Sequence, residues 1–136
     1  MHIPMQWAVI AHRHDRGSKM TTDEPTPQQI EAVAAYLSLL SSRGSLANTD
    51  LRGLDLRKQT LSGAKLAEAA LTGANLTAAN LRAATLTGAD LRGANLSGAD
   101  LRWANLALAD LTGAVLTRAI YDAATRWPQD FTPPPR

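Results

Sequence analysis

Leucine recurs at every fifth residue through the central part of the chain, and this period constrains the fold more than any other feature. Five residues on an α-helix rotate a side chain by about 140°, so leucines at this spacing would point to all sides. Five steps along one straight strand would place them on alternating faces. All of them can face one interior only if the chain turns a corner after each repeat. Fifteen consecutive positions keep the spacing without exception: Leu46, Leu51, Leu56, Leu61, Leu66, Leu71, Leu76, Leu81, Leu86, Leu91, Leu96, Leu101, Leu106, Leu111 and Leu116.

The residues around each leucine fit a square coil of four repeats and twenty residues. Alanine stands two residues before the leucine in the last eleven repeats, from Ala64 to Ala114, where the wall leaves little room inside. Asp or Asn directly precedes nine of the fifteen leucines, and seven of the nine glycines follow two residues after a leucine, where they suit a tight turn. We therefore predict an all-β solenoid instead of the helices that an Ala- and Leu-rich composition first suggests.

The stretches GADLRGANLSGADLRWANLALADL and GANLTAANL resemble the pentapeptide-repeat family, whose pattern is A-(D/N)-L-x-x. The resemblance covers residues 46–120 and implies a right-handed quadrilateral β-helix, here of about four coils, with Leu in the centre and Ala at the inward corner. Residues twenty apart would then stack in ladders: Leu46/Leu66/Leu86/Leu106, Leu51/Leu71/Leu91/Leu111, Leu56/Leu76/Leu96/Leu116 and Leu61/Leu81/Leu101/Tyr121.

Both ends of a solenoid expose unpaired backbone, and the N-terminal side of the repeats has a candidate cover. Thr26-Pro27-Gln28-Gln29 has the signature of a helix start, and apolar residues follow at helical spacing until Gly44. We predict a short α-helix over about 27–42 that caps the first coil. A helix that binds a partner is the alternative.

The C-terminal side has a second candidate cover. The tail YDAATRWPQDF resembles a segment that often ends pentapeptide-repeat domains, so we expect Tyr121, Trp127 and Phe131 to cover the last coil. The predicted organisation is therefore a flexible leader over 1–25, a capping helix over 26–43, the β-helix over 44–120, and a C-terminal cap with a loose Pro-rich tail over 121–136.

Charge and cysteine content exclude several classes of protein. Fourteen Lys and Arg against twelve Asp and Glu leave a net charge of +2, and no block carries the single-sign field of a dedicated nucleic-acid binder. The absence of cysteine excludes disulfides and thiolate metal sites and suits a cytoplasmic protein. No segment has the length of a transmembrane helix, so no membrane association is expected, and the short apolar run near the N-terminus lacks the features of a signal peptide.

The sequence offers no catalytic, cofactor or metal site. His2, His12 and His14 all lie in the leader, where no further ligand completes a metal geometry and no Ser–His–acid arrangement can be built. The glycines recur as turn formers and compose no phosphate-binding motif. We predict a protein that is not an enzyme and uses no cofactor.

Large apolar residues break the repeat pattern near its C-terminal end. Trp103 and Leu108 stand where other repeats have a small turn residue, while Val115 and Ile120 replace the usual outward residue. Two interpretations remain open: the C-terminal tail folds back over these residues, or a homodimer forms through this end, as in some members of the family. The candidate interface is Trp103, Leu108, Val115, Ile120, Trp127 and Phe131.

The outer walls also carry stacked charges. The twenty-residue register aligns Asp50, Asp90 and Asp110 on one wall, where Arg52 and Arg92 neutralise much of the acid. Another wall stacks Arg82 and Arg102, with Asp100 beside them. A basic column could hold an acidic partner, although arginines in such repeats usually face solvent. The candidate charged face is Arg82, Arg102, Asp90 and Asp110.

A rigid surface without chemistry predicts a non-enzymatic interaction or scaffold protein with an unknown protein partner. The resemblance implies an alternative, because the best-understood branch of the family mimics B-form DNA, binds DNA gyrase and protects it from quinolones. Mimicry needs a strongly acidic surface, whereas residues 46–120 carry eight basic and six acidic side chains. Direct nucleic-acid binding is a third hypothesis, disfavoured by neighbouring aspartates and by the lack of stacking aromatics along the repeats; it would use Arg52, Arg57, Arg82, Arg92 and Arg102.

Overall fold

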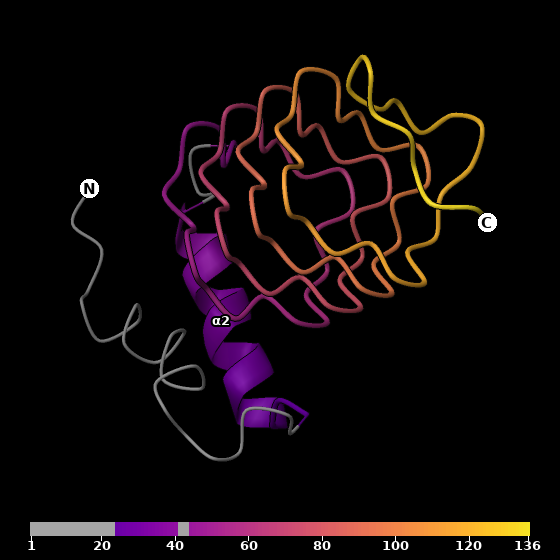
Figure 1. Ribbon diagram of the computed structural model, residues 1–136. Helices are drawn as coiled ribbons and strands as arrows, with labels where there is room; N and C mark the ends of the chain where they lie inside the picture. Colours follow the sequence, from indigo (N-terminus) through magenta and orange to yellow (C-terminus); the bar gives the residue numbers. More distant parts are fainter. Residues whose placement is uncertain (1–23, 41–43) are drawn as a thin grey trace.

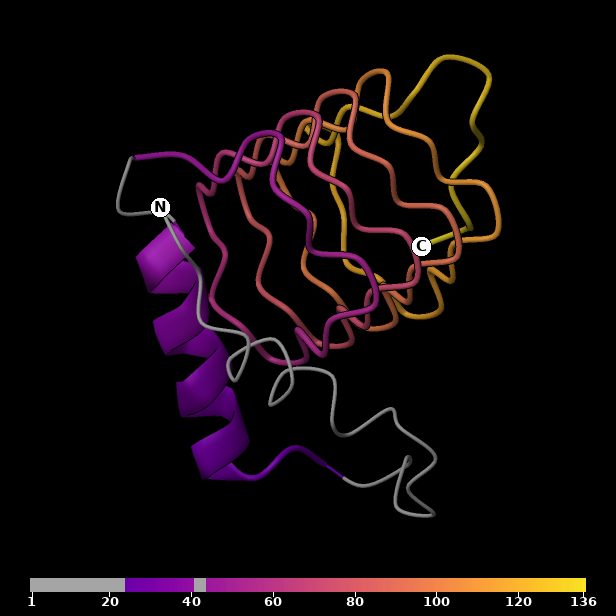
Figure 2. The ribbon, with the colours of Figure 1, turned by 90° about the vertical axis from the view of Figure 1, so that its left-hand side faces the viewer.

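The computed structural model describes residues 24–40 and 44–136 of this 136-residue chain. In these ranges one helix, α2 (Pro27–Leu40), precedes a stack of square coils that winds toward the C-terminus (Figure 1). The helix and the C-terminal tail lie at opposite ends of the stack, and Figure 2 shows the coils from the side of the helix. Within the described residues the walls pair through single β-bridges and contain no longer strand.

Parallel bridges fix the register of the coils. In the described part of the chain, eleven bridges join residues twenty apart, beginning with Asp50↔Ala70. The twelfth, Asn105↔Arg126, joins residues 21 apart, so the tail contains one residue more than the repeat would require. The twenty-residue register stacks the leucines of successive coils in four columns.

The same turn builds the corner in all fifteen repeats. The N–H of the third residue after each leucine donates to the leucine carbonyl at 2.9–3.3 Å, and the residue before it has a φ between 57° and 73°, as in a type II turn. A Cβ in this left-handed conformation costs about 1–2 kcal/mol, so the corners carry backbone strain wherever glycine is absent. Glycine holds seven of the positions, and eight hold other residues: Asn48, Lys58, Glu68, Ala78, Ala83, Trp103, Leu108 and Arg118.

The Asp or Asn before a leucine has a structural role in the wall. In all nine repeats that have Asp or Asn there, the side-chain Oδ1 accepts the backbone N–H of the residue after the leucine, at 3.0–3.3 Å. Short polar side chains commonly satisfy the nearby backbone in this way. The Asp/Asn preference of the repeat is therefore explained inside the molecule and needs no external partner.

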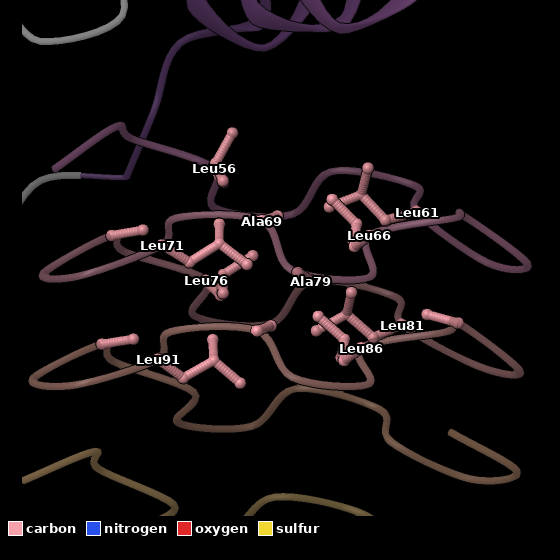
Figure 3. Packing of buried hydrophobic residues seen from close by; sticks show 14 of the residues in the cluster. Leu56, Leu61, Leu66, Ala69, Leu71, Leu76, Ala79, Leu81, Leu86 and Leu91 are labelled. Atoms are coloured by element: carbon pink, nitrogen blue, oxygen red, sulfur yellow. The ribbon is translucent and has the colours of Figure 1, made fainter. Parts of the chain in front are cut away.

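Leucine and alanine columns fill the interior. Figure 3 shows leucines of successive coils pointing into the same space, with alanines between them. The repeat leucines from Leu66 to Leu106 and the inward-corner alanines, every fifth residue from Ala69 to Ala104, are at most 1% exposed. Burial of one leucine side chain stabilises the fold by about 1.5–3 kcal/mol, which exceeds the strain of one corner.

The helix α2 begins at the expected capping box. Gln29 N–H donates to Thr26 Oγ1 at 3.2 Å, and Thr26 N–H donates to Gln29 Oε1 at 2.7 Å. Val33, Tyr36 and Leu37 are buried in the core cluster. The helix was expected to run to about residue 42; it is described to Leu40, and residues 41–43, like the leader over 1–23, lie outside the described residues.

Three aromatic residues of the tail pack against the core at the other end. Tyr121 continues the column of Leu101, because Leu101 N–H donates to the carbonyl of the residue before Tyr121. Trp127 meets Tyr121 edge to face, with centroids 5.2 Å apart, and stacks with Phe131 at 5.3 Å. In the Pro-rich tail, which is predicted to be loose, the carbonyl of Pro134 accepts from the Tyr121 hydroxyl.

Replacement of Gly93 by Ala should lower the free energy of unfolding by about 1 kcal/mol. A Cβ at Gly93 would meet no heavy atom within 4 Å, so only its φ of 66° opposes the change. The reverse change Ala83→Gly, at a φ of 57°, should not lower stability. Urea denaturation of the full chain measures both, and equal losses in the two variants would show that turn strain is not the cause.

Candidate interaction surface

Trp103 and Leu108 occupy corners whose backbone favours glycine. Their φ angles are 65° and 64°, and the side chains are 63% and 81% exposed. This conformation is a genuine outlier for bulky residues. Each residue therefore adds strain of about 1–2 kcal/mol while it places an apolar side chain in water.

Val115 and Ile120 stand at wall positions where most repeats have a capping side chain. They bridge to Asn95 and Asp100, each of which accepts the N–H two residues further along its own coil. The side chains of Val and Ile cannot accept this hydrogen bond, which contributes about 0.5–1.5 kcal/mol to the free energy of unfolding. Both side chains are also exposed, so these positions likewise reduce stability and present apolar surface.

The four exposed side chains encircle the last coil instead of forming one patch; we call Trp103, Leu108, Val115 and Ile120 the apolar belt. Each repeat makes a quarter turn, so the first two lie at the corners that flank the wall of Asn105, and the last two lie on later walls. The C-terminal tail does not cover them, since all four stay exposed. The contact of the tail with Trp103 is a backbone one, from its N–H to Asp122 Oδ1 at 3.3 Å.

Trp127 and Phe131, the other two members of the candidate interface, have a different environment. Both are half-buried, stack on one another and pack against the core cluster. Their contacts suit a cover for the last coil. The belt and these rings are therefore separate features, which the sequence alone had grouped together.

The aspartates of the candidate charged face bond within their own wall. Asp90 Oδ2 accepts from Arg92 Nη2 at 2.6 Å, and this hydrogen bond holds the pKa of Asp90 well below its usual range. Asp110 Oδ1 accepts from the Thr112 hydroxyl at 2.6 Å, which also lowers the pKa of Asp110. A bridge joins Asp90 and Asp110, so the predicted column exists, and its side chains are already engaged.

One arginine of the predicted arginine column is likewise paired with an aspartate. Arg102 Nη2 donates to Asp100 Oδ2 at 2.5 Å, and this bond is the main cause of the lowered pKa of Asp100. Arg82 lies one coil earlier, because Asn80 bridges to Asp100, and its positive charge lowers the same pKa further. The column therefore presents an arginine beside an Asp–Arg pair and not two unneutralised cations.

Local Asp–Arg pairing extends to four of the five arginines considered for nucleic-acid binding. The pair Asp55–Arg57, joined at 2.6 Å, is nearly buried, with side chains 8% and 9% exposed. The recurring Asp-Leu-Arg triplet is the sequence signal that could have revealed this pairing. The four arginines that bond the aspartate two residues earlier are Arg52, Arg57, Arg92 and Arg102.

Metal sites and membrane spans are not found in the part of the chain that the structure describes. Over residues 24–40 and 44–136, no group of three or more metal-ligating side chains comes together. His2, His12 and His14 lie outside these ranges. In the same ranges no helix is long and apolar enough to cross a membrane.

Replacement of Val115 by Asn should raise the free energy of unfolding by about 0.5–1.5 kcal/mol. The new side chain can accept the Thr117 N–H and hydroxyl, as Asn95 does for Ser97 at 3.0 and 2.6 Å one coil earlier. Asn95→Val is the matched control and should lower stability by a similar amount. Thermal and urea denaturation check both; a Val115→Asn variant no more stable than the wild type would reject the missing-cap explanation.

Comparison with known proteins supports the interpretation of the repeats. The sequence model of the family described as pentapeptide repeats matches eight copies, over residues 45–77, 61–98, 74–113 and 94–120. A search of curated proteins gives no match to this chain.

Several solved structures are similar to this chain. Among them are alr5209, a pentapeptide repeat protein from Nostoc PCC 7120 (35% identity, 72% of this chain and 87% of that chain, TM-score 0.49), and Rfr23 from the cyanobacterium Cyanothece 51142 (36%, 57% and 56%, TM-score 0.37). QnrB1, a plasmid-mediated fluoroquinolone resistance protein, is 22% identical over 57% of this chain and 39% of its own, with a TM-score of 0.46. With its repeats matched from residue 45 to 120, this chain belongs to the pentapeptide-repeat family, whose fold is the right-handed quadrilateral β-helix.

Proposed function

We propose that this chain is a non-enzymatic interaction or scaffold protein and that the apolar belt contacts its protein partner. Pentapeptide repeat proteins are in general non-enzymatic structural or interaction proteins, which supports the first part. The claim that the belt contacts a partner rests on the folding stability that its four residues remove. All four of its residues stand where the repeat favours a different residue, and all four are exposed.

A partner explains this combination better than folding does. Two belt residues add turn strain and two remove a hydrogen bond, each an effect of about 1 kcal/mol. Strained residues and exposed apolar side chains are both enriched at functional surfaces, and tryptophan is a frequent anchor of protein interfaces. Contact with a partner would bury the belt and offset the stability that the free protein lacks.

The ends of the scaffold belong to the same proposal. We infer that about four coils form it, that α2 caps the first coil and that the tail aromatics cap the last. Support for the N-terminal cap comes from the bond of Gln59 Nε2 to the Ile30 carbonyl at 3.2 Å and from the complete burial of Leu56. A cap of this kind blocks edge-to-edge association over the part of the coil that it covers.

Trp103→Asp should abolish binding of the partner without loss of stability, because the side chain is exposed and strained. Ala83→Asp is the matched control, since Ala83 occupies the same corner one coil earlier and also has a positive φ of 57°. Affinity capture from cells that express the protein should recover one protein with the wild type and Ala83→Asp, and lose it with Trp103→Asp. Recovery of the same proteins by all three would exclude the belt as the binding surface.

A second copy of the chain is one partner that the same variants test. Light scattering on the purified protein should then give twice the monomer mass of 14.5 kDa for the wild type and the monomer mass for Trp103→Asp combined with Ile120→Asp. A molar mass unchanged by the substitutions would reject a homodimer through the belt.

The alternative function, mimicry of DNA toward gyrase, is less well supported by the charges. A mimic must present unneutralised acidic groups in place of phosphates. In the described repeats, Asp50, Asp55, Asp90 and Asp100 each form an ion pair with the arginine two residues later. The outer walls therefore carry alternating charge in place of a continuous negative surface.

A supercoiling assay separates the two functions. We expect the purified chain to leave DNA gyrase activity and its quinolone inhibition unchanged at micromolar protein, because its acids are paired. Inhibition of supercoiling, or protection from the drug that increases with protein concentration, would favour the mimic. The Trp103→Asp variant would then show whether the belt takes part.

A further inference from the structure

The helix α2 covers only part of the N-terminal opening of the coils. Its first half lies over the wall of Asp55 and Gln59, where Leu56 is completely buried. On the next wall Leu61 is 6% exposed and Ala64 is half-buried. One coil later, the residues at the same two positions are 0% and 1% exposed. The helix therefore covers the wall of Leu56 and leaves the wall of Leu61 partly open.

A groove lies at this uncovered part, with a volume of about 550 Å³. One side is formed by the apolar residues Ile30, Ala34 and Leu37 of α2, and the other by the wall that runs from Lys58 to Lys65. The groove is thus a space between a helix and the first turn of the coil, at the end of the stack opposite to the apolar belt.

The floor of the groove is an unpaired strand edge. On the same wall one coil later, Asn80 N–H donates to the Gln59 carbonyl at 2.9 Å, and the carbonyls of Asn80 and Arg82 accept from the preceding coil at 2.7 Å. The equivalent groups one coil earlier are the N–H and carbonyl of Thr60 and the carbonyl of Ser62. Among the described residues these three groups have no hydrogen-bond partner, and both residues are exposed. An edge of this kind accepts an added strand.

The charge of the groove determines which kind of peptide strand can bind at this edge. Among the described residues that line it, Lys58 and Lys65 are charged and none is Asp or Glu. Lys58 already forms an ion pair with Glu24, an exposed residue outside the lining, which leaves Lys65 as the lining cation for a partner among the described residues. Opposite charge across a contact favours the matching partner and disfavours the wrong one.

We propose that this groove binds an extended, acidic peptide segment of a partner protein as an additional parallel strand. The segment would repeat the pattern of the wall beneath it, with three backbone hydrogen bonds to Thr60 and Ser62. Small and leucine-like side chains would cover Leu61 and Ala64, and acidic side chains would point outward toward the lysines. This site is independent of the apolar belt, because the two share no residue.

The probe is the synthetic peptide acetyl-GADLEG-amide, in which Ala and Leu take the inward positions and Asp and Glu the outward ones. Added at millimolar concentration to the full ¹⁵N-labelled protein, it should cause saturable shifts of the backbone amides of Thr60, Leu61, Ser62 and Gly63. A peptide with an N-methylated Leu should cause none, because it lacks the donor for the Thr60 carbonyl. The lysine peptide acetyl-GAKLKG-amide should cause none either, because its charges oppose the groove.

Protein variants test the same groove from the other side. Lys65→Glu should weaken binding of the acidic peptide by about fivefold. Thr85→Glu is the matched control, since Thr85 bridges to Lys65 one coil later and lies outside the lining, and it should leave the affinity unchanged. Absence of shifts at residues 60–63, equal binding of the lysine peptide, or equal weakening by both variants would each overturn the proposal. Trp103→Asp should leave peptide binding intact, so failure here and failure of the belt can be told apart.

Discussion

The left-handed residue that follows each of the fifteen repeat leucines by two positions is the constraint on which the rest of the structure depends. It closes a turn onto the leucine carbonyl, swings the chain by a quarter turn and returns the next leucine to the same interior. Eight corners do this with a side chain that the conformation disfavours. They persist because one buried leucine contributes about 1.5–3 kcal/mol, more than the 1–2 kcal/mol of strain at one corner.

The architecture could be predicted from the sequence because a strict period of five has one geometric solution, and the column from Leu61 to Tyr121 follows from it. Other features depend on which neighbour a side chain selects, and spacing does not determine that choice. The bonds of Asp and Asn to the backbone, the burial of Asp55 with Arg57, and the 21-residue step before Trp127 are of this kind. Whether the tail would cover Trp103 was equally undetermined, because both outcomes satisfy the same pattern.

The two ends of the stack differ from its walls in how well their groups are satisfied. Along the walls, backbone groups pair with the next coil, and aspartates pair with arginines two residues away. This self-sufficiency leaves the walls little to offer a partner. The departures are local: apolar side chains at disfavoured positions around the last coil, and an unpaired edge with two lysines beside α2. Partner recognition in this protein is thus expected where backbone groups lack a hydrogen-bond partner or apolar side chains stay exposed.

The quarter turn per repeat has a consequence for the geometry between the two ends. Insertion of one five-residue repeat in the middle of the stack would preserve the local turn yet rotate everything beyond it by about 90° relative to α2. Insertion of four repeats would restore the original phase and only lengthen the stack. Repeat number therefore acts as an angular setting as well as a measure of length. A lineage that gained or lost single repeats would change the direction in which Trp103 faces relative to the groove, without altering a single residue of either.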